Sequence, residues 1–288
     1  MIIIGCSNSK DLAKRISSGL DWEYSSLNVK RFPDGELYVK FDVNLKNKNV
    51  VLVQTLHPPN EALLELILAS HTAKDLGCKK LTLVIPYLAY IRQDKRFNAG
   101  ESVSSKIVGR LLSVADEVIT IDPHLHRFKS LSEVFKTKTI KLSANDLIQD
   151  YISKRFASPV IIGPDAESYQ WARSIANKIN ASAAILEKER LSSSKVVEKL
   201  NSEVSVEDKD VLIIDDIIST GHTILEVIRI IRKMKPKSIN IVGIHGIFTD
   251  RSVLDFIKEY SDSIATTNTI NNSFAKIDVS GLICDSLK

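Results

Sequence analysis

The chain has 288 residues, 44% of them hydrophobic and 26% charged, with a net charge of +4, values typical of a globular protein with one large core or two ordinary ones. The charge is too small to indicate nucleic acid, although it suits small anionic substrates, and no apolar run approaches the ~18 residues that span a membrane. Cys6, Cys78 and Cys284 form no CxxC pair, which predicts a reducing, cytoplasmic location and no thiolate zinc site. We therefore expect neither nucleic acid nor a membrane among the partners.

Short apolar segments alternate with amphipathic ones along the whole chain. This alternation predicts a parallel α/β architecture, because helices join the strands of a parallel sheet. In the first half we expect strands at 2–5, 26–29, 37–41, 50–54, 81–86 and 118–121, and helices at 11–17, 60–76 and 102–114. In the second half we expect strands at 160–163, 183–186, 211–214 and 239–246, and helices at 144–156, 168–180, 220–234 and 252–260.

The two halves repeat one order of elements. Residues 50–86 and 210–246 each run from an apolar strand through a polar loop and an amphipathic helix to a second apolar strand. We infer two domains of one fold, 1–142 and 143–288, with the segment from Asn268 folding back on the first. Residues 55–59 of the first copy lack the acids and hydroxyls found in the second, so a sugar-phosphate site is expected only in the second domain.

The segment 211–223 carries the clearest chemical signal. An apolar strand ends in two carboxylates, and hydroxyl residues with one glycine precede the next helix. Ligands of open α/β sheets bind at the carboxyl ends of strands, and helix N-termini attract anions. Carboxylates suit ribose hydroxyls or hydrated Mg²⁺, whereas a plain strand end with a helix cap would need only one Asp. The segment predicts a sugar-phosphate site made of Asp215, Asp216, Ser219, Thr220, Gly221, His222 and Thr223, and it resembles the phosphoribosyl-diphosphate loop of the type I phosphoribosyltransferase fold.

A turn at 31–36 combines an aromatic ring with two acids. Pro33 and Gly35 favour a tight bend. Phe32 is suited to stacking on a nucleobase, and Asp34 or Glu36 to accepting hydrogen bonds from an exocyclic amine. Taken alone, the turn is more often a solvated hairpin loop.

Cations follow two other strands. Arg92-Gln93-Asp94-Lys95-Arg96 suits a polyphosphate, although a solvated charge run is the commoner case. Lys188 and Arg190 enter a Ser-rich stretch that we interpret as a mobile loop able to close over a polyphosphate. Taken alone, that stretch is typical of a surface hairpin.

Acids and histidine stand at the remaining strand ends. Mg²⁺ prefers oxygen ligands, water and phosphate, so His124 is expected to contact a coordinated water or a phosphate. Asp165 is expected either to hold a second Mg²⁺ or to cap the following helix. A zinc site at 122–127 would need further ligands that the sequence does not place.

The ordered set of motifs resembles the ribose-phosphate pyrophosphokinase family, especially its archaeal branch, over essentially the whole chain. The resemblance rests on Phe32-Pro33-Asp34-Gly35-Glu36, Arg92-Gln93-Asp94, Asp122-Pro123-His124, Gly163-Pro164-Asp165, Lys188-Glu189-Arg190 and Asp215-Asp216 with Ser219 to Thr223. It implies two tandem type I phosphoribosyltransferase-like domains, each a mainly parallel sheet flanked by helices. It also implies that the diphosphoryl group of ATP moves, with Mg²⁺, to the 1-hydroxyl of ribose 5-phosphate, giving 5-phosphoribosyl 1-diphosphate and AMP for nucleotide biosynthesis.

The resemblance also implies a role for each matched residue. The catalytic cations are Lys188 and Arg190, and the metal side comprises His124 and Asp165. The expected ATP-binding residues are Phe32, Asp34, Gly35, Glu36, Arg92, Gln93, Asp94 and His124. The expected ribose 5-phosphate residues are Arg190, Asp215, Asp216, Ser219, Thr220, Gly221, His222 and Thr223. Because the family shares its adenine site between subunits, we expect a homo-oligomer, with dimer and hexamer both open.

Two departures and three alternatives accompany this interpretation. Many members carry an acid at the position of Ser219 and glycine at that of His222. A nucleobase phosphoribosyltransferase would share the loop but would not need the first domain or the 32–36 turn. A regulatory subunit should have lost Lys188 or the Asp pair, and a repressor should carry a winged helix and a basic face.

Overall fold

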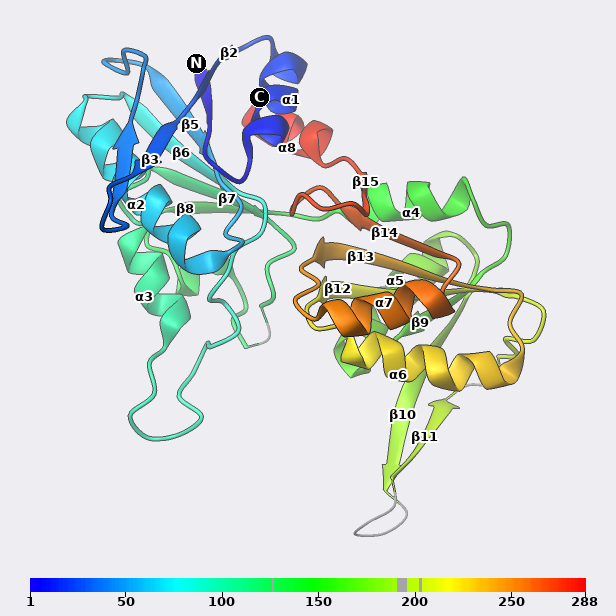
Figure 1. Cartoon of the computed structure of the whole chain (residues 1–288). Coiled ribbons are helices and arrows are strands. Elements are labelled where there is room, and N and C mark those ends of the chain that lie inside the picture. Colours follow the sequence, from blue (N-terminus) through cyan, green and yellow to red (C-terminus); the bar gives the residue numbers. More distant parts are fainter. Residues whose placement is uncertain (126, 191–195, 202–203) are drawn as a thin grey trace. The chain divides into compact units, whose positions relative to one another are not determined.

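The computed structural model describes residues 1–125, 127–190, 196–201 and 204–288. The chain forms two compact units (Figure 1), one comprising Met1–Ser143, Thr269–Asn271 and Val279–Lys288, the other Ala144–Asn268 and Asn272–Asp278. The chain thus crosses between the units several times, whereas the sequence predicts one boundary. No helix in the described part of the chain has both the length and the apolar character needed to cross a membrane.

The first unit is built on an all-parallel sheet with the strand order β2-β1-β5-β6-β7-β8. Its central strands are largely buried and rich in Ile, Val and Leu, which is typical of parallel strands covered on both faces. The strands are β1 Ile2–Gly5, β2 Glu23–Ser26, β5 Asn49–Val53, β6 Lys80–Ile85, β7 Glu117–Ile121 and β8 Lys138–Leu142.

The helices of this unit are α1 Lys10–Leu20, α2 Pro59–Asp75, α3 Ser104–Leu111, α8 Ser280–Leu287 and the 3₁₀ turn η1 Leu131–Glu133. Helix α1 buries Leu12, Ala13 and Ile16 on one face. Helix α8, from the far end of the chain, packs against α1 (Figure 1). The final segment thus returns in part to the first unit, through Thr269–Asn271 and Val279–Lys288, whereas Asn272–Asp278 belong to the second unit.

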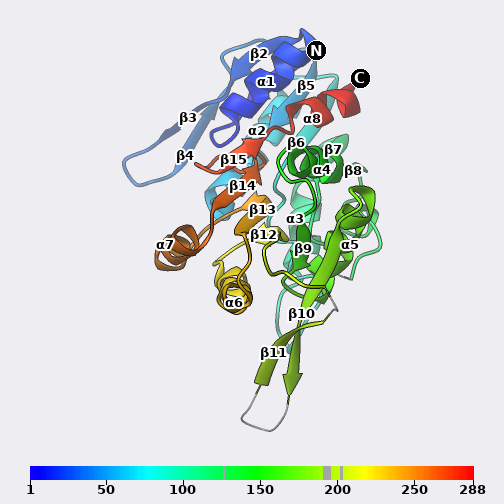
Figure 2. The same cartoon turned by 90° about the vertical axis from the view of Figure 1, so that its right-hand side faces the viewer.

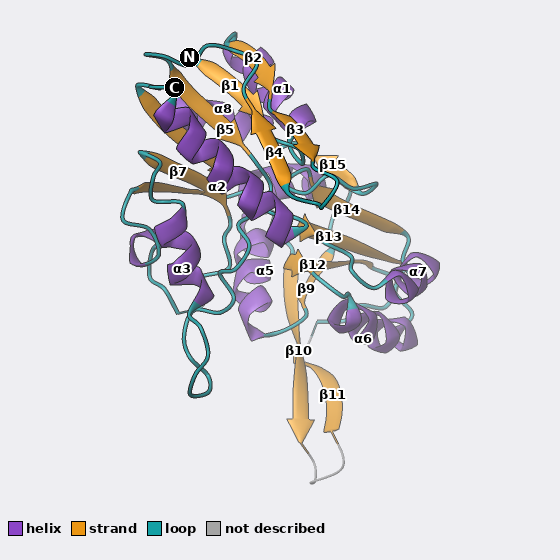
Figure 3. Cartoon of the chain, turned by 60° about the vertical axis from the view of Figure 1, so that its left-hand side comes forward, coloured by secondary structure: helices purple, strands orange, loops and turns teal. Residues whose placement is uncertain are grey.

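A separate antiparallel hairpin, β3 Asn28–Arg31 with β4 Leu37–Lys40, carries the 32–36 turn. Helix α2 contacts β4, and the two lie side by side in Figure 3. The hairpin is thus supported by the helix that follows β5.

The second unit has the sheet order β11-β10-β9-β12-β13-β14-β15, parallel except for the β10–β11 pair. Apart from the added β11, this strand order repeats that of the first unit, which confirms the predicted duplication at the level of topology. The strands are β9 Val160–Gly163, β10 Ser182–Arg190, β11 Val196–Asn201, β12 Asp210–Ile218, β13 Ser238–Gly246, β14 Ser263–Thr267 and β15 Ala275–Ile277.

Helices cover both faces of this second sheet. Figure 2 shows α6 and α7 on one side of β12 and β13 and α5 on the other. Helix α6 buries Ile224, Leu225, Val227, Ile228 and Ile231, the apolar stripe visible in the sequence. The helices are α4 Asn145–Ser153, α5 Ala166–Lys178, α6 His222–Ile231, α7 Arg251–Tyr260 and the 3₁₀ turn η2 Arg232–Met234.

The predicted fold class is confirmed. The prediction that a mobile loop begins at Lys188 is wrong. Strand β10 continues through Lys188 to Arg190, where it pairs antiparallel with β11, so both cations lie on a strand. Residues 191–195 of the predicted loop fall outside the described residues. Polar residues make this hairpin hard to predict from the sequence, because backbone pairing with a neighbouring strand defines it.

Gly163, at the end of β9, permits the close approach of α5. A Cβ atom there would lie 2.5 Å from both the backbone nitrogen and Cα of Tyr169. We expect Gly163→Ala to lower the free energy of unfolding by ~1–3 kcal/mol or more, because backbone cannot rotate away as a side chain can.

Urea unfolding followed by circular dichroism measures this effect. Gly281→Ala is the matched control, since it is helical and has nothing within 4 Å of the new Cβ, so it should be neutral or stabilising by up to ~1 kcal/mol. Equal effects of the two substitutions would contradict the steric argument.

Candidate active site

Strand β12 ends in a crevice of the second sheet. Its pairing with β9 stops at Ile213, whereas its pairing with β13 continues to Ile218. Asp215 and Asp216 therefore lie where β12 has lost one neighbour. The chain leaves β9 toward β10 and leaves β12 toward β13, so this edge is the topological switch point at which open α/β sheets bind ligands.

The predicted phosphate loop closes tightly between β12 and α6. Gly221 adopts φ +86°, and a Cβ there would approach Ile257 Cδ1 at 2.8 Å. Thr249 N donates to Ser219 O at 3.0 Å, which ties the loop to the segment after β13. The side chains of Thr220, His222 and Thr223 are exposed, and Ser219 is half-buried. The first N–H groups of α6 are therefore presented beside exposed hydroxyls, an arrangement suited to an anion.

Three carboxylates meet at this edge. Burial raises the pKa of Asp215 well above its ordinary value, and the nearby charges of Asp216 and Asp165 raise that pKa further. Crowded carboxylates of this kind favour a cation, or hydroxyl donors, over an empty site. Asp165 and Asp216 therefore lie close enough to Asp215 to act on its charge.

Asp165 also caps helix α5. Its carboxylate accepts Ser168 N–H at 2.9 Å and Ser168 Oγ–H at 2.8 Å. The N-cap alternative is thus confirmed, and it coexists with the proximity of Asp165 to Asp215.

The described residues contain no group of three or more His, Cys, Asp or Glu side chains arranged to hold a metal. A hydrated Mg²⁺ needs only one or two carboxylates when phosphate and water complete its shell. The chemistry of the Asp165–Asp215–Asp216 cluster fits such an ion, whereas a metal cage made by the protein alone does not fit.

His222 lies near the N-terminus of α7. Asp250 caps that helix, accepting Val253 N–H at 3.2 Å. A hydrogen bond from the Ser252 hydroxyl is the main cause that lowers the pKa of Asp250, and His222 contributes a smaller electrostatic effect. His222, where many family members carry glycine, therefore interacts electrostatically with the Asp250 carboxylate.

The predicted catalytic cations occupy the β10–β11 hairpin. Lys188 pairs in register with Glu198, and Arg190 with Val196. Their side chains lie outside what the structure describes.

The predicted adenine turn is exposed on its hairpin. Phe32 is 50% exposed and meets Tyr38 edge to face, with 6.0 Å between ring centroids. Gly35 adopts φ +94° and donates to Phe32 O at 2.9 Å, while Glu36 N donates to Asp34 Oδ1 at 3.2 Å. The turn is thus ordered by its own backbone while its aromatic face is open.

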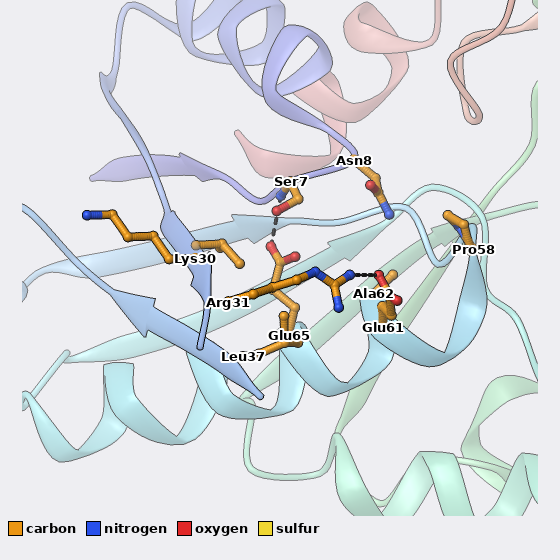
Figure 4. Close-up of a pocket in the computed structure, with 10 residues that line it drawn as sticks. Ser7, Asn8, Lys30, Arg31, Leu37, Pro58, Glu61, Ala62 and Glu65 are labelled. Carbon is orange, nitrogen blue, oxygen red and sulfur yellow. Dashed lines mark hydrogen bonds and ion pairs between the residues drawn. The ribbon is translucent and has the colours of Figure 1, made fainter. Parts of the chain in front are cut away.

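A pocket of about 440 Å³ lies beside the base of this hairpin (Figure 4). Arg31 on β3 forms an ion pair with Glu61 on α2, and Glu65 one turn later accepts Ser7 N–H at 2.8 Å. Glu65 is only 4% exposed. Sequence reasoning missed these residues, although acids spaced i, i+4 on a helix were a visible signal. Their contacts secure the hairpin that carries Phe32.

The Arg92 segment follows β6 within a long loop that extends from the sheet (Figure 1). Arg92 is exposed, but Asp94 is buried and accepts two hydrogen bonds from Arg127 Nη1, at 3.0 and 3.2 Å. Gln93 is anchored by Ser104 and Ser105. The structure therefore leaves Arg92 open and commits the Asp94 carboxylate to a protein partner. His124 is half-buried on the neighbouring loop after β7.

Comparisons with known proteins agree along the whole chain. Residues 1–115 match the family model of the N-terminal domain of ribose phosphate pyrophosphokinase, and residues 130–276 match that of the phosphoribosyl transferase domain. The chain is 36% identical over 289 residues to the ribose-phosphate pyrophosphokinase of Methanothermobacter thermautotrophicus, and 36% identical over 299 residues to that of Saccharolobus solfataricus. Each alignment covers 100% of this chain and 100% of the relative's sequence.

A crystal structure of phosphoribosylpyrophosphate synthetase from Mycobacterium smegmatis shares the fold. The two superpose with a TM-score of 0.86 at 22% identity, over 99% of this chain and 97% of that one. On the strength of both domain models and the full-length relatives, this chain belongs to the ribose-phosphate pyrophosphokinase family.

Proposed function

We propose that this protein transfers the diphosphoryl group of ATP to the 1-hydroxyl of ribose 5-phosphate, producing 5-phosphoribosyl 1-diphosphate and AMP for nucleotide biosynthesis. The observation that carries the proposal is the carboxylate cluster and glycine-containing loop at the switch point of the second sheet. The family membership of the whole chain supports the same reaction. The location proposed is cytoplasmic, consistent with three free cysteines.

In the proposed mechanism the second unit holds the acceptor. The loop from Ser219 to Thr223 binds the 5-phosphate through backbone N–H groups and hydroxyls. Asp215 and Asp216 accept hydrogen bonds from ribose hydroxyls, which fixes the sugar with its 1-hydroxyl toward the β-phosphorus. The oxygen of that hydroxyl forms a bond to the β-phosphorus as the bond to the α,β-bridging oxygen breaks. AMP departs with the bridging oxygen, and the hydroxyl proton is released to solvent.

ATP is assigned to residues of the first unit. Arg92 and Gln93 contact the nucleotide and His124 its phosphate side, while the turn with Phe32, Asp34, Gly35 and Glu36 binds adenine in a neighbouring copy. The exposure of Phe32 supports this assignment. A homo-oligomer, dimer or larger, is therefore part of the proposal.

Charge neutralisation supplies most of the proposed catalysis, because phosphoryl transfer depends on positioning and electrostatics more than on a strong base. Lys188 and Arg190 stabilise charge on the transferring group, and Arg190 also contacts the sugar phosphate. Asp165 would help to hold Mg²⁺ beside the phosphates, where the ion would withdraw charge from the diphosphoryl oxygens.

The reaction is tested by quantifying products from purified protein, ATP, Mg²⁺ and ribose 5-phosphate. We expect AMP and 5-phosphoribosyl 1-diphosphate in equal amounts, formed only when ribose 5-phosphate is present. Formation of ADP would instead indicate transfer of a single phosphoryl group. Absence of turnover would contradict the proposed enzymatic activity.

Lys188→Ala should lower kcat by at least ~100-fold while changing the KM values far less, because the cation acts on charge that develops in the transition state. Steady-state kinetics on both substrates measure the split. Lys154→Ala, an exposed lysine on the second unit, serves as the control. A kcat for Lys188→Ala within about twofold of the parent would exclude the catalytic role.

Asp215→Asn should stabilise the ligand-free protein at pH 8 while abolishing ribose 5-phosphate binding. The raised pKa of Asp215 means that its ionised form is disfavoured in the folded state. The penalty is absent below the ordinary value of the unfolded chain and grows as pH rises through the folded-state pKa. The gain should therefore be a few degrees in Tm at pH 8 and should vanish toward pH ~4.

Asp210→Asn is the matched control on the same strand. The Ser238 hydroxyl and Lys237 lower the pKa of Asp210, so its loss should reduce stability at pH 8. Thermal unfolding across pH measures both variants. The same sign of effect for both would overturn the electrostatic account.

A further inference from the structure

Two loops of the first unit emerge from the adjacent parallel strands β6 and β7. One carries Arg92 and Gln93, and the other carries His124. Tyr90 adopts φ +66° in the first loop and Asp122 adopts φ +34° in the second. Residues other than glycine seldom adopt positive φ. Such conformations persist only where surrounding contacts impose them.

One ion pair joins the two loops. The side chain of Asp94 is only 2% exposed, and Arg127 Nη1 lies 3.0 Å and 3.2 Å from its two carboxylate oxygens. No other hydrogen bond or ion pair to the Asp94 carboxylate occurs within the described ranges. A buried carboxylate is costly without its cation, so this single partner determines where Asp94 can lie.

Arg127 is itself fixed by a second contact. Its guanidinium carbon stacks over the Phe97 ring at 5.2 Å from the centroid, and Lys95 lies at the same distance from that ring. Phe97 belongs to the same loop as Asp94. Arg127 therefore contacts the loop after β6 at two residues, through the ion pair with Asp94 and by stacking on the Phe97 ring.

The residue before Asp94 is anchored from the other side. Ser105 donates to Gln93 O through its backbone nitrogen at 3.3 Å and through its hydroxyl at 3.1 Å. Ser104 Oγ donates to Gln93 Oε1 at 3.2 Å. Arg92 and Gln93 are thus fixed between the start of α3 and Arg127, while the Arg92 side chain stays exposed.

We infer that Arg127 is a positioning residue for ATP, and that Asp94 acts through Arg127 rather than by contacting the nucleotide. The pair couples the loop bearing Arg92 and Gln93 to the loop bearing His124. This inference rests on the proposed function, which assigns those three residues to ATP.

The test is a double-mutant cycle with Asp94→Asn, Arg127→Met and the double variant. Each single substitution should raise KM for ATP by about tenfold or more and leave KM for ribose 5-phosphate within about twofold. The KM for ATP of the double variant should be no higher than that of the more impaired single variant. The second substitution removes a group that has already lost its partner. Arg127→Lys should recover part of the ATP affinity, since it restores the charge without the planar fork.

Lys154→Gln breaks an exposed ion pair with Asp150 in the other unit and should change neither KM. Circular dichroism would verify that each variant is folded. An unchanged KM for ATP in Arg127→Met, or additive effects in the double variant, would overturn the inference while the reaction itself stands.

Hydrogen exchange in the ligand-free protein gives a readout independent of turnover. Amides of residues 90–101 should exchange faster in both single variants than in the parent. In the Lys154→Gln control, their exchange rates should equal those of the parent. If the parent made no AMP, the proposed function would fail, and the exchange data would still decide whether the ion pair fixes the loop. Unchanged exchange in Arg127→Met would refute the coupling.

Discussion

The crowding of carboxylates at the end of β12 is the constraint around which the second unit is arranged. β12 must extend beyond the end of its pairing with β9 for Asp215 and Asp216 to reach the crevice, and Gly163 must lack a side chain for α5 to place Asp165 nearby. The resulting desolvation and like-charge repulsion raise the pKa of Asp215. This unfavourable arrangement is typical of a site prepared for a cation and a polyhydroxyl ligand.

The two units share one strand order but differ at the start of the helix that follows the third strand, α6 in the second unit and α2 in the first. In the second unit, Gly221 lets the chain turn into α6 so that the first N–H groups of the helix face the loop. In the first unit, α2 begins at Pro58 and Pro59, which have no N–H to offer. The two copies of the fold therefore present different backbone donors at equivalent helix starts.

The first unit depends on contacts that hold exposed groups in place. The ion pair between Arg31 and Glu61 ties the hairpin to α2, and the pair between Arg127 and Asp94 ties the loops after β6 and β7. Exposed Phe32 adjoins Arg31 of the first pair, and exposed Arg92 lies two residues before Asp94 of the second. Rigid support of this kind reduces the entropy lost when a nucleotide binds.

The sequence by itself determined the α/β class, the duplication and the family, because these are recorded in local periodicity and in the order of short motifs. It also predicted a site that includes Asp165, Asp215 and Asp216, since the carboxyl ends of parallel strands share one edge of a sheet. Tertiary structure alone decided that Lys188 and Arg190 lie on a paired strand and that Asp94 is buried against Arg127. These outcomes depend on which distant residue supplies a hydrogen bond or an opposite charge, and no local pattern encodes that choice.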